Sequence, residues 1–224
     1  MAPVTAKSNR GGALAAQRDR ALATRADLLA AARKLFAEAG YHATGTTEIA
    51  AQAAMTRGAL YHHFAGKEEL FAEVFREVAE ELVRRSKSLV SPLAGDLWAK
   101  VSAAFQQYLQ LVAANEEYQR ILLIDGPAVL GWSRWRALQS EFVARGTTDA
   151  LQMLMDQGLV ELQPAEPLAY LIQAALNDAA LAIANAPAAT STGDSHDAMS
   201  AFDFLLNSIG RRARPAHDTG RSKR

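Results

Sequence analysis

Hydrophobic residues recur at helical spacing along most of the 224-residue chain. One such stripe lies between residues 24 and 40, and its members are Leu28, Ala32, Leu35 and Phe36. A longer stripe follows Lys67 and consists of Leu70, Phe71, Val74, Val78 and Leu82. Strict alternation of apolar and polar residues, which marks a half-buried strand, does not extend over a useful length. The pattern therefore predicts an all-α protein.

The helical periodicity is absent before Thr24. Residues 1–22 are polar and contain Gly11-Gly12, so we expect a flexible basic arm there. Thr24 followed by Asp27 resembles a capping box, which predicts that the first helix begins at this point. Gly40 is placed to end that helix, because glycine adopts the left-handed conformation of a C-cap without strain.

The chain beyond residue 90 shows several more helical patterns. Ser91-Pro92 and Gly95 predict a loop and a domain boundary. Helices are expected over residues 96–114, 116–124, 133–157, 166–185 and 196–212. The segments DGPAVLGWS, QPAEP and NAPAATSTGDSH are expected to separate some of them. Residues 213–224 are basic and are expected to form a disordered tail.

The stretch TTEIAAQAAMTRGALYHHF, residues 46–64, holds two short helical patterns joined by about three residues. This arrangement predicts a helix-turn-helix. Ala50 and Ala53 are small where two helices would cross closely, and Ile49, Leu60 and Phe64 can fill a small core beneath them. In such a motif the second helix enters the major groove of DNA.

Several polar residues of this segment can then face outward. They are Thr46, Thr56, Arg57, Tyr61, His62 and Lys67. Hydroxyl, guanidinium and ammonium groups are the side chains that bind phosphate oxygens. Gly58 removes a side chain where the helix would approach DNA closely. The alternative interpretation is a helical hairpin that only packs against the rest of the chain.

The sequence LFAEAGYHATGTTEIAAQAAMTRGALYHHFAGKEELF resembles the DNA-binding signature of the TetR/AcrR family of bacterial transcriptional regulators. The resemblance covers roughly residues 24–75. It implies a three-helix helix-turn-helix domain over residues 23–70, joined by a long helix to a helical ligand-binding and dimerisation domain over residues 71–212.

The resemblance also implies a set of DNA contacts, most of them to phosphates. These are Thr46, Thr56, Arg57, Gly58, Tyr61, His62, His63 and Lys67. Arg57, with Thr56 beside it, is the choice for reading base edges, because arginine can pair bidentately with guanine. Two residues depart from the family pattern. Ala54 stands where the family usually has glycine, and a left-handed alanine would cost roughly 1–2 kcal/mol. Met55 replaces a residue that is commonly small or β-branched, so base contacts there are expected to differ.

The resemblance implies that the last two helices of two subunits form a four-helix bundle. The apolar stripes available for it are Leu168, Leu171, Ile172, Ala175, Leu176, Ala179 and Ile183, and Phe202, Leu205, Leu206 and Ile209. Small residues among them allow close helix approach. The alternative is that both stripes cover the core of their own subunit.

Aromatic and methionine residues on the middle helices are candidates for a ligand pocket, since pockets are mostly apolar with few polar groups. Trp98, Phe105 and Tyr108 recur on about one helical face. The other candidates are Trp132, Met155 and Asn177, with Trp135, Phe142 and Met153 also available. This set predicts an apolar or aromatic small-molecule effector. The alternative is that these side chains are plain core.

Composition and charge change this picture little. Half of the residues are hydrophobic and cysteine is absent, which excludes disulfides and thiolate metal sites. The net charge is zero, but residues 1–67 hold nine Lys/Arg against four acids and the tail from Arg211 holds six against one. A local basic surface can therefore still meet a polyanion. Neither a signal peptide nor an apolar run of roughly 20 residues is present, so we expect a cytoplasmic protein with no membrane partner.

Catalytic signatures are absent from the sequence. It contains no H-E-x-x-H, G-x-S-x-G or glycine-rich phosphate loop, and we predict no enzyme, cofactor or metal. The sequence thus predicts a ligand-responsive repressor that acts as a homodimer on a palindromic operator. The alternative is a helical scaffold or small-molecule-binding protein without operator control.

Overall fold

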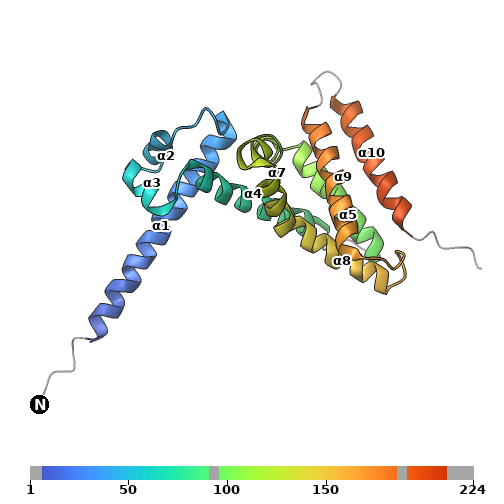
Figure 1. The fold of residues 1–224 in the computed structure, drawn as a ribbon, viewed down its shortest axis with the longest axis horizontal. Coiled ribbons are helices and arrows are strands. Elements are labelled where there is room, and N and C mark those ends of the chain that lie inside the picture. Colours follow the sequence, from blue (N-terminus) through green and yellow to red (C-terminus); the bar gives the residue numbers. More distant parts are fainter. Residues whose placement is uncertain (1–6, 91–95, 186–190, 211–224) are drawn as a thin grey trace, which may run out of the picture. The chain divides into compact units, whose positions relative to one another are not determined.

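The computed structural model describes residues 7–90, 96–185 and 191–210. Apart from one isolated antiparallel bridge between Val160 and Gly210, these residues contain no β-structure, which confirms the all-α prediction (Figure 1). The elements are α1 (Lys7–Ala39), α2 (Thr46–Gln52), α3 (Arg57–His63), α4 (Lys67–Val90), α5 (Leu97–Ala113), α6 (Glu116–Tyr118), the π-helix η1 (Gln119–Asp125), α7 (Gly126–Gln139), the π-helix η2 (Ser140–Ala144), α8 (Arg145–Asp156), α9 (Ala165–Asn185) and α10 (Ser191–Ile209).

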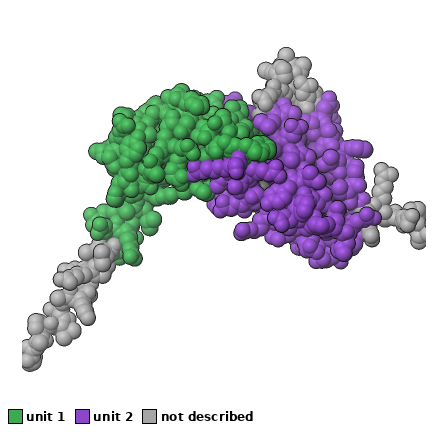
Figure 2. Space-filling view, viewed as in Figure 1, with its two compact units in different colours: residues 1–78, 120–132 green, residues 79–119, 133–224 purple. Residues whose placement is uncertain are grey.

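The chain divides into two compact units (Figure 2). Unit 1 spans residues 1–78 and 120–132, and unit 2 spans residues 79–119 and 133–224. The division falls within α4, between Val78 and Ala79. The loop and boundary that the sequence predicted at 91–95 lie outside the described residues, and so does the tail at 213–224.

The core of unit 1 is built by α1, α2, α3 and the first part of α4. Contacts join α1 to both α2 and α3, and α2 to α3 (Figure 1). Most of the predicted inward residues are buried, and these are Leu28, Ala32, Phe36, Ile49, Ala50, Leu60, Phe64, Leu70, Phe71, Val74 and Val78. Leu35 and Ala53 are partly exposed instead. Phe36 and Phe71 meet edge to face with ring centroids 5.3 Å apart. Each large side chain buried in this way contributes roughly 1.5–3 kcal/mol.

Helix α1 is longer than the sequence predicted. It begins at Lys7 rather than at Thr24, so residues 7–22 are helical where a flexible arm was expected. The physical reason is composition, because this stretch is rich in alanine and arginine, which are strong helix formers. Gly11-Gly12 costs only about 1 kcal/mol per glycine and does not interrupt the helix. Residues 1–6 lie outside the described residues.

Unit 2 is organised around α9, which contacts α5, α8 and α10. Most of the two predicted apolar stripes are buried within this chain; the buried members are Ile172, Leu176, Ala179, Ile183, Phe202 and Leu206. Phe202 of α10 also meets Phe105 of α5 edge to face at 5.8 Å. Leu171 and Leu205 are exposed instead, together with Phe204.

One predicted boundary in the second half of the chain is wrong. Residues 133–156 are helical throughout, with the π-helix η2 between α7 and α8. The expected DGPAVLGWS linker lies largely within α7, which begins at Gly126 and has a kink at Gly131 with φ 70° and ψ 158°. Pro127 is accommodated because the first helical turn needs no hydrogen bond from its N–H.

The polar segment before the last helix is also partly helical, since α10 begins at Ser191, five residues before the expected start. Residues 186–190 lie outside the described part. None of the described helices is long and apolar enough to cross a membrane.

Candidate nucleic-acid interface

The turn between α2 and α3 is closed by backbone hydrogen bonds. The N–H groups of Ala54 and Met55 donate to the carbonyl oxygens of Ala51 and Ala50, at 3.0 and 2.8 Å. This pair of bonds is a Schellman motif, which requires a left-handed residue directly after the C-cap. Ala54 occupies that position with a φ of 54°. The strain anticipated for an alanine in this turn is therefore present.

Helix α3 is started by a side-chain cap. The hydroxyl of Thr56 accepts a hydrogen bond from the N–H of Ala59 at 3.2 Å. A threonine cap of this kind stabilises a helix by about 1 kcal/mol. The start of α2 is supported differently, because the N–H of Gly45 donates to the carboxylate of Glu48 at 3.4 Å. Glu48 is thus turned back toward its own helix terminus.

Three of the predicted DNA-contacting side chains lie together on the exposed side of α2 and α3. The hydroxyls of Thr46 and Tyr61 are 3.5 Å apart, and Nη2 of Arg57 donates to the Tyr61 hydroxyl at 3.4 Å. The Arg57 guanidinium also lies over the Tyr61 ring, 5.4 Å from its centroid. Hydrogen bonds to Thr46 and then to Arg57 lower the pKa of Tyr61. These long bonds leave most guanidinium donors of Arg57 available for another acceptor.

The end of α3 carries His62 and His63, whose rings meet edge to face at 5.3 Å. Helix α3 contains no acidic residue. A surface with hydroxyl, guanidinium and imidazole groups and no carboxylate on its central helix suits a polyanion.

Gly58 is exposed, and the fold itself has no need of a glycine there. A Cβ at this position would meet only the Thr56 hydroxyl, at an ordinary 3.8 Å. Glycine inside a helix is destabilising by roughly 0.5–1 kcal/mol relative to alanine. The missing side chain therefore leaves room for something outside the chain to approach the helix.

Lys67 is placed differently from the other predicted contacts. Its ammonium donates to the carbonyl oxygens of Tyr41 and Thr44, at 2.8 and 2.9 Å, and lies 4.0 Å from the centroid of the Tyr41 ring. The buried Thr44 hydroxyl binds the carbonyl oxygen of Gly40 at 2.8 Å. Together these bonds hold the loop between α1 and α2. Two of the three ammonium donors of Lys67 are thus used within the protein.

Sequence reasoning missed a second support of the same loop. Oδ2 of Asp125 accepts a hydrogen bond from the N–H of Tyr41 at 2.8 Å, and Nη1 of Arg120 donates to the carbonyl oxygen of Glu38 at 2.8 Å. Both side chains belong to η1, which lies more than eighty residues further along the chain. The Arg120 guanidinium meets a bare carbonyl oxygen at the end of α1, and the Asp125 carboxylate meets an N–H group. Each charge thus lies beside a group of opposite partial charge. No local sequence signal could have found these pairs.

Unit 2 contains a cavity of about 460 Å³. Its wall is mostly apolar, and the residues that line it include Val83, Val101, Ala104, Phe105, Tyr108, Phe142, Met153 and Leu176. This volume lies within the usual range for sites that bind small molecules. Of the six residues predicted to bind a ligand, Phe105 and Tyr108 line this cavity.

The other four lie elsewhere. Trp98 packs against Gly210, where a Cβ would come within 2.9 Å of its indole ring. Trp132 belongs to unit 1 and is 64% exposed. Met155 is buried in the core, and Asn177 is buried with its Oδ1 accepting from Nε2 of Gln173 at 2.9 Å.

Comparisons with known proteins agree with the helix-turn-helix geometry. Residues 28–74 match the family model described as bacterial regulatory proteins of the tetR family, and residues 98–209 match the model of a tetracyclin repressor-like C-terminal domain. The chain belongs to the TetR family of bacterial transcriptional regulators.

Individual relatives support this membership. A solved TetR-family transcriptional regulator from Pectobacterium atrosepticum is 34% identical, with a TM-score of 0.74, and the match covers 88% of this chain and 99% of that one. The transcriptional repressor KstR2 of Mycobacterium tuberculosis is 36% identical over 104 residues, which are 43% of this chain and 52% of KstR2. The TetC protein of transposon Tn10 from Escherichia coli is 23% identical over 70% of this chain and 78% of that protein.

As a TetR-family member, the chain is a DNA-binding transcriptional regulator. All of the predicted DNA-contacting residues lie inside the matched segment 28–74. The family membership thus supports DNA binding by the chain, while the surface and the residues that make the contact stay a prediction.

Proposed function

We propose that this TetR-family regulator is a ligand-responsive repressor that binds a near-palindromic operator as a homodimer. The observation that carries the proposal is the cluster of Thr46, Arg57 and Tyr61 on a helix-turn-helix surface whose second helix has no acid. The repressor role is supported by KstR2, a transcriptional repressor that is similar to this chain over 104 residues.

DNA binding would use this cluster with its neighbours on α3. The proposed contacts are Thr46, Thr56, Arg57, Gly58, Tyr61, His62 and His63. Arg57 would read a guanine edge with its fork of donors, because its one hydrogen bond to Tyr61 is long and easily exchanged. Lys67 would act mainly on the loop that positions α2, with its remaining donor available to a phosphate.

Dimerisation would use apolar side chains that the chain itself leaves uncovered. Leu171 of α9 is 69% exposed, and Phe204 and Leu205 of α10 are 76% and 44% exposed. Large apolar residues gathered on two adjacent helices mark an interaction surface. A two-fold dimer matches the symmetry of a palindromic site, whose half-sites lie about 34–36 Å apart.

Ligand response would act through the cavity of unit 2. A ligand can release DNA only if it binds the DNA-incompetent arrangement more tightly. Helix α4 contributes to both units and so offers a continuous connection. A tenfold loss of operator affinity needs a coupling free energy of about 1.4 kcal/mol.

The test begins with selection of bound sequences from random duplex DNA, followed by affinity measurements at several salt concentrations. If each half of the dimer contacts on the order of four phosphates, log K should fall with log salt at a slope of about −7. Selection of no common sequence, or binding that ignores salt, would instead support the alternative of a helical scaffold or a ligand-binding protein without operator control.

The dimer is tested by Phe204→Asp, which should yield monomers in analytical ultracentrifugation and lose operator binding. Leu162→Asp is the matched control, because Leu162 is 82% exposed but lies outside α9 and α10. Equal behaviour of the two variants would overturn the proposed interface.

A further inference from the structure

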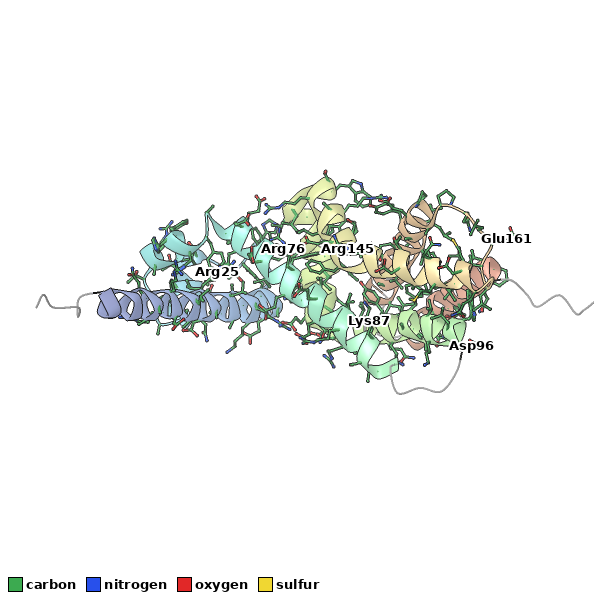
Figure 3. All side chains as sticks on the ribbon, turned by 90° about the horizontal axis from the view of Figure 1, so that it is seen from below. Arg25, Arg76, Lys87, Asp96, Arg145 and Glu161 are labelled. Carbon is green, nitrogen blue, oxygen red and sulfur yellow. The ribbon has the colours of Figure 1, made fainter. Side chains whose placement is uncertain are left out.

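The cavity of unit 2 is apolar except where charged residues line it. Lys87 comes from α4, Lys100 from α5 and Asp149 from α8. Two ammonium groups and one carboxylate give this wall a net positive charge. Among the described residues, neither lysine has a side-chain hydrogen bond or an ion pair. Figure 3 shows Lys87 on the second half of α4.

The ammonium of Lys87 is accommodated by a glycine. A Cβ at Gly146, in the first turn of α8, would lie 3.1 Å from Nζ of Lys87. That distance is tighter than an ordinary contact, so a larger residue there would shift the end of the Lys87 side chain by a few tenths of an ångström. Glycine is also unfavourable inside a helix by roughly 0.5–1 kcal/mol relative to alanine. Gly146 therefore lies directly beside the Lys87 ammonium at the cavity wall.

An uncharged polar group, the hydroxyl of Tyr108, also belongs to this wall. Tyr108 is buried, with 4% of its surface exposed, and it lines the cavity. Its hydroxyl has no hydrogen bond to any other described residue. Burial raises the pKa of Tyr108, so the hydroxyl keeps its proton and can donate. A hydroxyl at a cavity wall that has no protein partner can bind a ligand or water.

The rest of the wall suits a hydrocarbon body. Val83, Val101, Ala104, Phe105, Phe142 and Leu176 present aliphatic and aromatic carbon. A volume of about 460 Å³ holds a small organic molecule rather than a bare inorganic anion.

We propose that the effector is a small organic acid, whose carboxylate binds Lys87 and Lys100 and accepts a hydrogen bond from Tyr108 while its aromatic or aliphatic body fills the apolar part of the cavity. This proposal rests on the proposed ligand-responsive function, because it names the ligand class of that same cavity. A carboxylate accepts hydrogen bonds from ammonium groups and from a hydroxyl donor. Asp149 would disfavour ligands with several negative charges and so favours a single carboxylate.

The experiment measures binding to the full-length, DNA-free protein by calorimetry. The probes are 2-naphthoate, 4-phenylbutyrate and octanoate, each paired with its uncharged amide. We expect at least one acid to bind and to exceed its amide at least tenfold in affinity. Lys87→Met and Lys100→Met should each weaken acid binding about tenfold while leaving amide binding nearly unchanged. Lys87→Arg, which keeps the positive charge, should retain most of the acid affinity.

Two further variants separate position from charge. Arg84→Met removes an exposed cation of α4 that does not line the cavity, and it should bind the acids like the wild type. Tyr108→Phe keeps the ring and should weaken the acids more than the amides. Thermal unfolding of every variant checks that unit 2 remains folded.

The proposal is overturned if no acid binds, if the amides bind as tightly as the acids, or if the double variant Lys87→Met/Lys100→Met keeps wild-type acid affinity. Operator binding without ligand is measured on the same preparation. If the ligand-free wild type binds a specific operator but the protein does not prefer acids, only the proposed ligand class is overturned. If the ligand-free wild type binds no specific operator, the proposed function itself is overturned.

Discussion

The ammonium nitrogen of Lys67 lies 2.8 Å from the carbonyl oxygen of Tyr41 and thereby ties the first turn of α4 to the loop between α1 and α2. Lys67→Met keeps the aliphatic stem and removes the donors. It should lower the free energy of unfolding by about 1–2 kcal/mol, because hydrogen bonds from a charged group are worth roughly 1.5–3 kcal/mol and this one is only part-buried. Urea denaturation followed by circular dichroism measures the change.

Lys34→Met is the matched control for Lys67, since Lys34 is an exposed lysine of α1 and its loss removes the same charge. It should leave the free energy of unfolding within about 0.5 kcal/mol of the wild type. Unchanged stability in Lys67→Met, combined with weaker DNA binding and a salt slope lower by about one unit, would show instead that Lys67 acts mainly on phosphate.

Ala54→Gly should stabilise unit 1. The left-handed φ of 54° strains an alanine by roughly 1–2 kcal/mol, and the greater freedom of glycine in the unfolded chain offsets about half of that gain. Ala53→Gly is the neighbouring control, because Ala53 has a φ of −83° and gains nothing from glycine. The two variants should therefore shift the urea midpoint in opposite directions, and shifts of the same sign would contradict a strained turn.

Arg57→Ala should weaken operator binding by about 1–3 kcal/mol and relax the preference at one base step. The guanidinium is exposed and only loosely held by Tyr61, so its removal should not destabilise the fold. Arg57→Lys separates charge from geometry, since lysine keeps the charge but lacks the planar fork. Arg57→Lys should recover much of the affinity for unrelated DNA, but it should not restore the preference at that base step. A selection experiment that returns the wild-type sequence for both variants would remove Arg57 from base reading.

Asp125→Ala should loosen the start of the loop between α1 and α2. It leaves the part-buried N–H of Tyr41 without its acceptor, which costs about 1–3 kcal/mol. Asp125→Asn keeps an acceptor oxygen, so its free energy of unfolding should lie between those of Asp125→Ala and the wild type. Hydrogen exchange at the Tyr41 amide should be slowest in the wild type, faster in Asp125→Asn and fastest in Asp125→Ala. Protection that is identical in all three proteins would contradict a stabilising role for this bond.

Alkaline pH should destabilise the protein through its buried tyrosines. Burial raises the pKa of Tyr108 and is also the largest cause of the raised pKa of Tyr118. In the unfolded chain a tyrosine releases its proton near pH 10, while the folded protein still holds it. Stability is therefore complete below about pH 10 and falls as the pH rises further. Tyr108→Phe should flatten this fall in urea denaturation measured between pH 8 and 11; an equally steep fall would show that Tyr108 does not contribute.

The local pattern of the sequence by itself determined the helices that position the site. The spacing of Leu28, Ala32 and Phe36, and that of Ile49, Leu60 and Phe64, predicted the core of unit 1, and each of these residues is buried. The C-cap at Gly40 was equally readable. Helical periodicity and capping involve residues within about four positions of one another, so a short segment of sequence is enough to predict them.

Only the tertiary structure decided which side chains meet across the chain. Lys67 was predicted to face DNA, yet packing brings it to two carbonyl oxygens more than twenty residues away. The bond from Tyr41 to Asp125 spans eighty-four residues. The cavity likewise includes Phe105 and Tyr108 but not Trp98, although all three share roughly one helical face. Such pairings depend on how whole helices pack, since a residue's neighbours in a core come from several elements and not from its own period.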